Sequence, residues 1–167
     1  MKKIMNFPIP RTSVFLPSIR SGWNVGAFFR TADSLGIEKI FLSGVSPFPP
    51  HKEISKTALD ADMFVPWTYF EDDREAAEYI KNSGIYIVAV ELTDDAEELS
   101  SEVFKNIYTK NPEISEICLL MGNEISGVSE ELLSYAKKTV FIPMKGKKQS
   151  MNVSVAGAIA MWEMSKK

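Results

Sequence analysis

The chain has 167 residues with a formal net charge of -3, and its 45% hydrophobic and 25% charged residues are typical of one globular domain. This composition excludes collagen-like, disordered and disulfide-scaffold proteins, and the single cysteine, Cys118, favours a reducing compartment. The first residues lack the apolar core of a signal peptide and no stretch reaches the ~18 apolar residues of a membrane span, so we expect a cytoplasmic protein with a single domain over residues 1–167.

Short apolar or β-branched runs predict the strands of the fold. In chain order they cover residues 12–17, 39–44, 63–67, 85–92, 117–121 and 139–144. Because helical patterns alternate with these strands, we expect an α/β fold with a mainly parallel sheet and helices on both faces.

Three segments have the pattern of helices. Residues 24–35 repeat apolar side chains at helical spacing, which leaves Arg30 off the apolar stripe and allows Asn24 to cap the helix. Residues 72–83 predict an acidic, solvated helix that ends at Gly84. The run over about 152–165 predicts a mostly buried helix that begins at Ser150 or Asn152.

Several common chemistries are excluded by missing residues. His51 is the only histidine, so nucleophiles activated by histidine and multi-histidine metal sites are excluded, and we interpret His51 as a surface loop residue. No metal site is expected, because CxxC and HExxH motifs are absent. Residues 122–129 have the glycine spacing of a phosphate-binding loop, but Val128 stands where such a loop needs lysine.

Three polar, glycine-bearing segments remain as candidates for function. They are residues 24–33, 121–129 and 142–156, each at a junction between a predicted strand and a helix. Loops at the carboxyl ends of parallel strands bind ligands in open α/β sheets. We therefore expect the three segments to converge on one crevice.

Charge is distributed unevenly along the chain. Residues 1–30 hold five basic residues, including Lys2 and Lys3, and no acid, and residues 137–167 hold seven lysines and one acid. Residues 31–136 hold 7 basic and 21 acidic residues, a net charge of -14. If the two ends meet, they form a basic face that suits RNA; the alternative is that the charges are scattered over the surface.

The three segments contain motifs in a recognisable order. Asn24–Ala32 contains N-x-G-x-x-x-R-T-A, Met121–Ser129 contains M-G-N-E-x-x-G-V-S, and Ile142–Ala156 contains I-P-M-x-G-x-x-x-S-x-N-V-S-V-A. Together they resemble the SpoU family of RNA ribose 2′-O-methyltransferases over almost the whole chain. Residues 56–67 also resemble the middle segment of this family, with Asp60 where glycine is common.

The resemblance implies a SPOUT-type fold, in which the C-terminal segment forms a trefoil knot, binds S-adenosylmethionine and forms a homodimer. Position by position, it implies cofactor contacts at Gly122, Ile142 and Met151, with Leu92 near the adenine. It implies that Arg30 is the catalytic arginine, supported by Asn24, Glu124, Ser150 and Asn152.

Two roles remain open for Arg30. Arginine is a poor base because its reference pKa exceeds ~12. Arg30 is therefore either a base activated by its surroundings, or a group that orients an RNA phosphate and stabilises the developing alkoxide while Ser150 or water relays the proton.

The expected substrate is transfer or ribosomal RNA. The expected phosphate contacts are Arg11, Arg20, Lys145, Lys147 and Lys148. The alternatives are a methyltransferase of the same fold that acts on a ring nitrogen of a base, and a non-catalytic RNA-binding factor.

Overall fold

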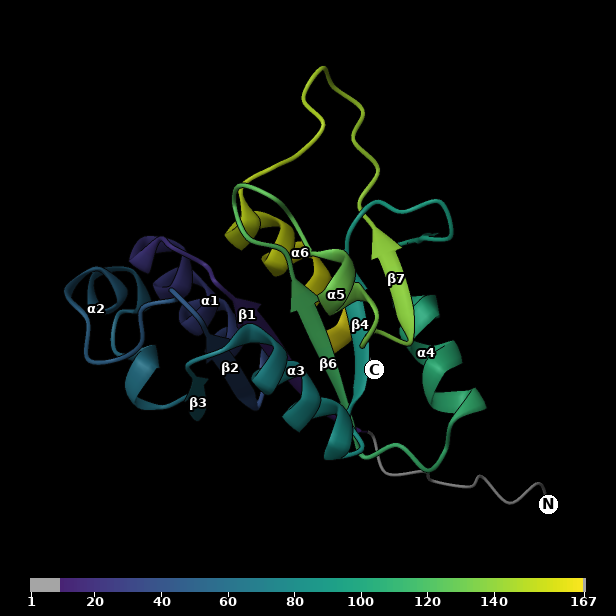
Figure 1. The fold of residues 1–167 in the computed structure, drawn as a ribbon, viewed down its shortest axis with the longest axis horizontal. Helices are drawn as coiled ribbons and strands as arrows, with labels where there is room; N and C mark the ends of the chain where they lie inside the picture. The colour runs from purple at the N-terminus through teal and green to yellow at the C-terminus, as the bar shows by residue number, and fades with distance from the viewer. Residues whose placement is uncertain (1–9, 167) are drawn as a thin grey trace.

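Seven parallel strands form one sheet, in the order β3-β2-β1-β6-β4-β7-β5, within the part of the chain that the structure describes (Figure 1). This computed structural model describes residues 10–166, so Lys2, Lys3 and Lys167 of the basic ends lie outside the described residues. The strands are β1 (Arg11–Pro17), β2 (Lys39–Ser43), β3 (Trp67–Phe70), β4 (Tyr86–Val90), β5 (Glu97–Glu98), β6 (Glu116–Met121) and β7 (Lys138–Phe141). The predicted parallel α/β sheet is confirmed.

Helices cover both faces of this sheet (Figure 1). They are α1 (Gly22–Leu35), α2 (Lys52–Ala58), α3 (Asp73–Asn82), α4 (Ser101–Lys110), α5 (Glu130–Leu133) and α6 (Val153–Ser165), together with the short 3-10 helix η1 (Ala61–Met63). Side chains of α1, α2, α4 and α6 pack on one face, and those of α3 and α5 pack on the other.

The central strand β6 shows why both faces are covered. Its residues Ile117, Leu119 and Met121 point into the core beneath α1 and α6, whereas Cys118 and Leu120 point into the core beneath α3 and α5. Successive side chains of a strand alternate between faces, so a strand that is apolar throughout needs a layer on each side.

The first helix begins earlier than predicted. Ser21, not Asn24, is its N-cap, and the Ser21 hydroxyl accepts a hydrogen bond from the Asn24 backbone N–H at 3.2 Å. Placing the cap at Asn24 was wrong because the apolar repeat extends back to Gly22, which is buried. The Asn24 side chain is thereby free to bond elsewhere.

The strand predicted over 63–67 is also wrong. This segment holds the end of η1 and an irregular turn, and β3 starts only at Trp67. Ala61 and Val65 are buried while Met63 and Phe64 are exposed, so burial recurs at a spacing of four and does not alternate.

The two other predicted helices are present as α3 and α6. Gly84 follows α3 in the left-handed conformation at φ 75°, and Asn152 caps α6 through hydrogen bonds from the backbone N–H groups of Ser154 and Val155. His51 caps α2, a helix that was not predicted from the sequence, by accepting a hydrogen bond from the Glu53 backbone N–H at 3.3 Å.

No helix within the described residues is long and apolar enough to cross a membrane.

Candidate active site

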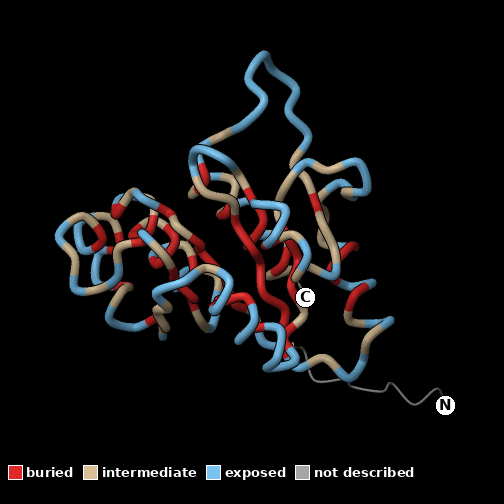
Figure 2. The backbone as a smooth tube through the Cα atoms, in the orientation of Figure 1, coloured by how far each residue is buried: buried red, intermediate tan, exposed pale blue. Residues whose placement is uncertain are grey.

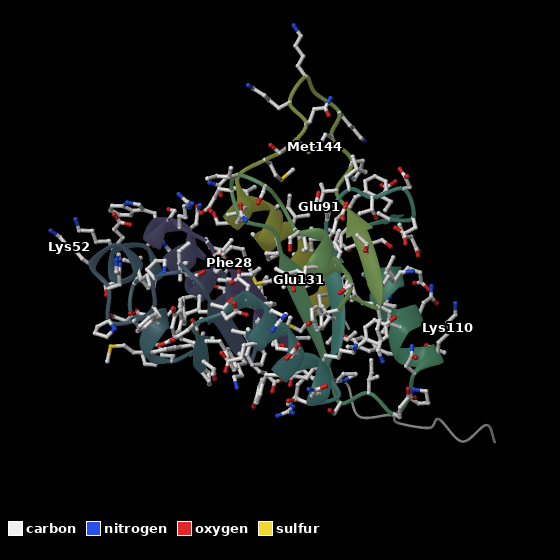
Figure 3. The ribbon with its side chains drawn as sticks, viewed as in Figure 1. Phe28, Lys52, Glu91, Lys110, Glu131 and Met144 are labelled. Atoms are coloured by element: carbon white, nitrogen blue, oxygen red, sulfur yellow. The ribbon has the colours of Figure 1, made fainter. Side chains whose placement is uncertain are left out.

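An open cavity of about 810 Å³ lies at the carboxyl ends of β4, β6 and β7. Residues 90–93, 121–128, 141–144 and 146–153 contribute its lining. Figure 3 shows Glu91 and Met144 at this end of the sheet. The second and third polar segments of the sequence therefore meet here, as predicted.

A tight turn after β6 forms one wall of the cavity. Asn123 and Gly127 exchange backbone hydrogen bonds of 3.2 Å, and the Asn123 side-chain oxygen accepts bonds of 2.9 Å from the N–H groups of Ile125 and Ser126. A Cβ at Gly122 would lie 2.6 Å from the carbonyl carbon of Gly127. Glycine is required at position 122 because the two arms of the turn approach so closely.

Glu91 connects this turn to the end of β4 through hydrogen bonds, a role that was not predicted from the sequence. One carboxylate oxygen of Glu91 accepts a bond of 2.9 Å from the Val128 N–H, and the other accepts one of 2.9 Å from the Leu92 N–H. The strand was predicted to run through residue 92, which hid Glu91 within it, whereas β4 ends at Val90. A lone acid at the carboxyl end of an apolar strand was the available signal.

Glu124, Asn24 and Asn152 join all three polar segments. The Glu124 carboxylate accepts hydrogen bonds of 3.2 Å from the backbone N–H groups of Arg20 and Ser21 and from the Asn24 side-chain amide. The Asn152 amide donates to the Asn24 side-chain oxygen, also at 3.2 Å. We call these three side chains the Asn24 network, which connects α1, the turn after β6 and the start of α6.

The network favours the ionised form of Glu124. Partial burial by itself would raise the pKa of the Glu124 carboxyl. Hydrogen bonds from its own backbone, Asn24, Ser21 and Arg20 outweigh this effect, so the pKa of Glu124 lies below its ordinary value. The network therefore carries a negative charge at neutral pH, beside the first turn of α1, where the helix dipole is positive.

The residues expected to contact a cofactor all line the cavity. These are Gly122, Ile142, Met151 and Leu92. Three of the residues expected to assist catalysis, Glu124, Ser150 and Asn152, line it as well. Arg30 does not line it, and is exposed on α1.

The expected RNA contacts fall into two groups. Arg20 lies just before α1, and Lys145, Lys147 and Lys148 are exposed in the loop between β7 and α6, which projects beyond the sheet (Figure 2). Arg11 stands apart from them at the first residue of β1, where it forms an ion pair of 3.3 Å with Glu116. The length of β1 puts Arg11 roughly 20 Å from the edge of the sheet that holds the cavity.

No cluster of three or more histidine, cysteine or carboxylate side chains that could hold a metal ion occurs among residues 10–166.

Comparison with known proteins identifies a family match over most of the chain. Residues 11–162 match the SpoU rRNA Methylase family. The chain is 30% identical to the tRNA (guanosine(18)-2′-O)-methyltransferase of Escherichia coli (strain K12), over 92% of this chain and 62% of that protein. It is 32% identical to the enzyme of the same name from Thermus thermophilus, over 92% of this chain and 74% of that protein.

Solved structures agree with this match. The AdoMet-bound rRNA methyltransferase from Sinorhizobium meliloti has a TM-score of 0.79 and 26% identity, covering 92% of this chain and 55% of that chain. The TrmH/SpoU tRNA modifying enzyme of A. aeolicus has a TM-score of 0.75 and 27% identity, covering 93% and 74%. The chain thus spans about three-fifths of the length of some of the proteins it matches.

Proposed function

The chain belongs to the SpoU rRNA methylase family, and on this premise we propose that it transfers a methyl group from S-adenosylmethionine to a ribose 2′-hydroxyl of transfer RNA. The observation that carries the proposal is the Asn24 network, through which the first motif of the family contacts the two motifs that line the cavity. The relatives at 30% and 32% identity are named for methylation of a tRNA guanosine at the 2′-oxygen, which favours transfer RNA over ribosomal RNA. A cytoplasmic location, where transfer RNA is found, is part of this proposal.

The cavity suits S-adenosylmethionine. Its volume of about 810 Å³ is within the range of ligand pockets, and Leu92, Ile142 and Met151 offer apolar surface for an adenine ring. Gly122 lines this cavity with backbone alone. When bound, the cofactor supplies an electrophilic methyl group on its sulfonium. The trefoil knot implied for the C-terminal segment remains part of the proposal.

The protein must hold the ribose in line with that methyl group, take up the hydroxyl proton and exclude water. A guanidinium donates up to five N–H groups in a planar fork that suits oxyanions, so we assign Arg30 to an RNA phosphate and to the developing alkoxide. Ser150, exposed ahead of α6, offers a hydroxyl that relays the proton. Asn24 and Asn152 fix α1 relative to the cavity.

The RNA phosphates are proposed to contact Arg20, Lys145, Lys147 and Lys148. Arg20 lies at the cavity end of β1, and the three lysines are exposed on the projecting loop. Each such contact releases counterions, so RNA affinity should fall steeply with added salt. Arg11 is not included in this surface, because it lies at the amino end of β1, on the side of the sheet away from the cavity, where it pairs with Glu116.

A homodimer completes the proposal. Val155, Ile159 and Trp162 follow one another along α6 at spacings of four and three, and all three are exposed. An apolar stripe of this kind on a helix marks a contact surface. Sedimentation at micromolar protein should give twice the 18.7 kDa mass of the chain, and a monomer mass would contradict the dimer.

The reaction is tested by transfer of a labelled methyl group from S-adenosylmethionine to transfer RNA and ribosomal RNA transcripts that lack modifications. Nuclease digestion then separates ribose-methylated from base-methylated nucleosides. We expect a ribose-methylated nucleoside from transfer RNA. Base methylation would favour the ring-nitrogen alternative. No transfer, combined with no calorimetric heat on adding the cofactor, would favour a non-catalytic RNA-binding factor.

Variants of Arg30 test its role in the reaction. Arg30→Ala should lower turnover roughly 100- to 1,000-fold, the effect of losing one donor to a developing oxyanion, and should keep cofactor affinity. Arg74→Ala is the matched control, because Arg74 is an exposed arginine on α3 whose partner, Glu78, lies on the same helix at 3.8 Å. Near wild-type turnover of Arg30→Ala would contradict the assignment.

A further inference from the structure

Trp23 is a large exposed aromatic residue beside the Asn24 network. It lies in the first turn of α1, and 46% of its surface is exposed although its neighbours Gly22 and Val25 are buried. Its backbone is held in place, because the Thr57 hydroxyl of α2 donates a hydrogen bond of 3.0 Å to the Trp23 carbonyl. The indole ring is therefore displayed to solvent from a fixed position.

Trp23 and Arg30 share one face of α1. They are seven residues apart, which on an α-helix separates them by about 20° around the axis and about 10.5 Å along it. Ala27, a small residue, lies between them on the same face. The side chain of Asn24, the residue after Trp23, does not share this face and bonds to Glu124 and Asn152.

A lysine lies beside the Trp23 ring. The Lys56 ammonium is 5.6 Å from the ring centroid, and Arg20 is exposed three residues before Trp23. Two carboxylates also lie at the start of α1: Glu53 faces Gly22, and Glu124 is bonded to Arg20, Ser21 and Asn24. An exposed aromatic ring with a lysine ammonium beside it matches the chemistry of single-stranded nucleic acid, which offers flat bases and phosphates together.

We propose that Trp23 stacks on an unpaired base of the RNA substrate, next to the nucleotide whose ribose faces Arg30, with Lys56 and Arg20 on the adjoining phosphates. This inference rests on the proposed function and adds a base-binding position to it. Proteins that recognise single-stranded RNA loops stack the unpaired bases on aromatic side chains. A base-binding position at Trp23 would therefore favour RNA with an unstacked loop over a continuous duplex.

Tryptophan fluorescence tests stacking independently of catalysis. An unmodified transfer RNA transcript is titrated into the full chain and into two variants, Trp23→Phe and Trp67→Phe. Trp67 is the control, because it is the first residue of β3, at the end of the sheet opposite the cavity, and packs against Phe48 with 5.8 Å between ring centroids. We expect RNA to quench the fluorescence of the wild type and of Trp67→Phe, and to lose most of that quenching in Trp23→Phe.

Affinity and turnover supply the second measurement. Trp23→Ala should weaken RNA binding roughly 5- to 140-fold, the range for losing one stacked base. It should raise KM for RNA more than it lowers kcat and leave cofactor binding unchanged, and Trp23→Phe should recover most of the RNA affinity. Equal quenching in Trp23→Phe and the wild type, or unchanged RNA affinity in Trp23→Ala, would overturn the inference.

Two outcomes separate this inference from the proposed function. If the wild type methylates no RNA but RNA still quenches Trp23, the base-binding position stands and the proposed reaction fails. If methylation proceeds and Trp23→Ala sediments as a monomer, the ring belongs to a contact between two copies of the chain and the inference fails.

Discussion

Replacing Gly157 with alanine tests how closely α1 and α6 must pack. A Cβ at position 157 would lie 2.1 Å from Cε1 and 2.4 Å from Cζ of Phe28. Carbon atoms in good contact are ~3.5 Å apart or more, so the ring or the helix must move by at least ~1.4 Å. Phe28 is fully buried in α1 (Figure 3), which leaves its ring little room to move away.

The size of the effect follows from two opposing contributions. Overpacking a core costs about 1–3 kcal/mol, and a clash with two ring carbons places Gly157→Ala near the upper end of that range. Alanine regains about 1 kcal/mol over glycine within a helix. We therefore expect the free energy of unfolding to fall by about 2 kcal/mol. The same displacement would separate Asn24 from Asn152 and lower methyl transfer.

Urea unfolding followed by circular dichroism measures this change. Gly146→Ala is the control, because no heavy atom lies within 4 Å of a Cβ placed there. Adding Phe28→Leu to Gly157→Ala should restore part of the loss, since leucine removes the ring edge that the new methyl group meets. A Gly157→Ala protein as stable as the wild type, with an unchanged urea dependence, would refute the close packing of these two helices.

Three further predictions concern single side chains. Glu124→Gln should destabilise the protein by about 0.5–1 kcal/mol at neutral pH. The folded pKa of Glu124 is lowered, so its stabilising effect is present above the unfolded pKa and lost as pH falls through the folded pKa; the difference in urea unfolding should therefore shrink in acid, and an equal difference at neutral and acid pH would argue against the network. Burial raises the pKa of Cys118 to about 12, so its thiol should not react with a disulfide reagent near pH 8 until the protein is unfolded; rapid labelling of the native protein would contradict this. Asp60 has φ 71°, so Asp60→Gly should raise the free energy of unfolding by up to about 1 kcal/mol and Asp60→Val should lower it by about 1 kcal/mol or more, as thermal melting would show.

Local patterns in the sequence predicted the sheet because its strands are buried on both faces. A continuous apolar run such as β6 identifies a buried strand from its own residues alone. Parallel pairing is expected because a helix lies between successive strands along the chain. The same reasoning predicted that the three polar segments converge, since each follows the carboxyl end of a strand. Asp60 stands where glycine is common in the family. Its backbone has a φ of 71°, the left-handed conformation that glycine adopts without strain.

Features that depend on tertiary contacts could not be predicted. Arg11 and Arg20, two of the three arginines in residues 1–30, count equally in the charge of that segment, yet they lie at opposite ends of β1. Glu91 acts through the Val128 N–H, 37 residues further along the chain. Residues 63–67 have the composition of a strand, but the packing of Ala61 and Val65 against the core determines their conformation.

The strand order has a consequence for how the protein is made. β1 pairs with β2 on one side and with β6 on the other, where Arg11 is opposite Glu116. During synthesis, β1, α1 and β2 can assemble early, but the centre of the sheet stays open until β6 leaves the ribosome. The cavity needs α6 as well, so it closes only after residues 153–165 have emerged. Binding of a cofactor to the nascent protein would therefore report that α6 has left the ribosome and packed against the sheet.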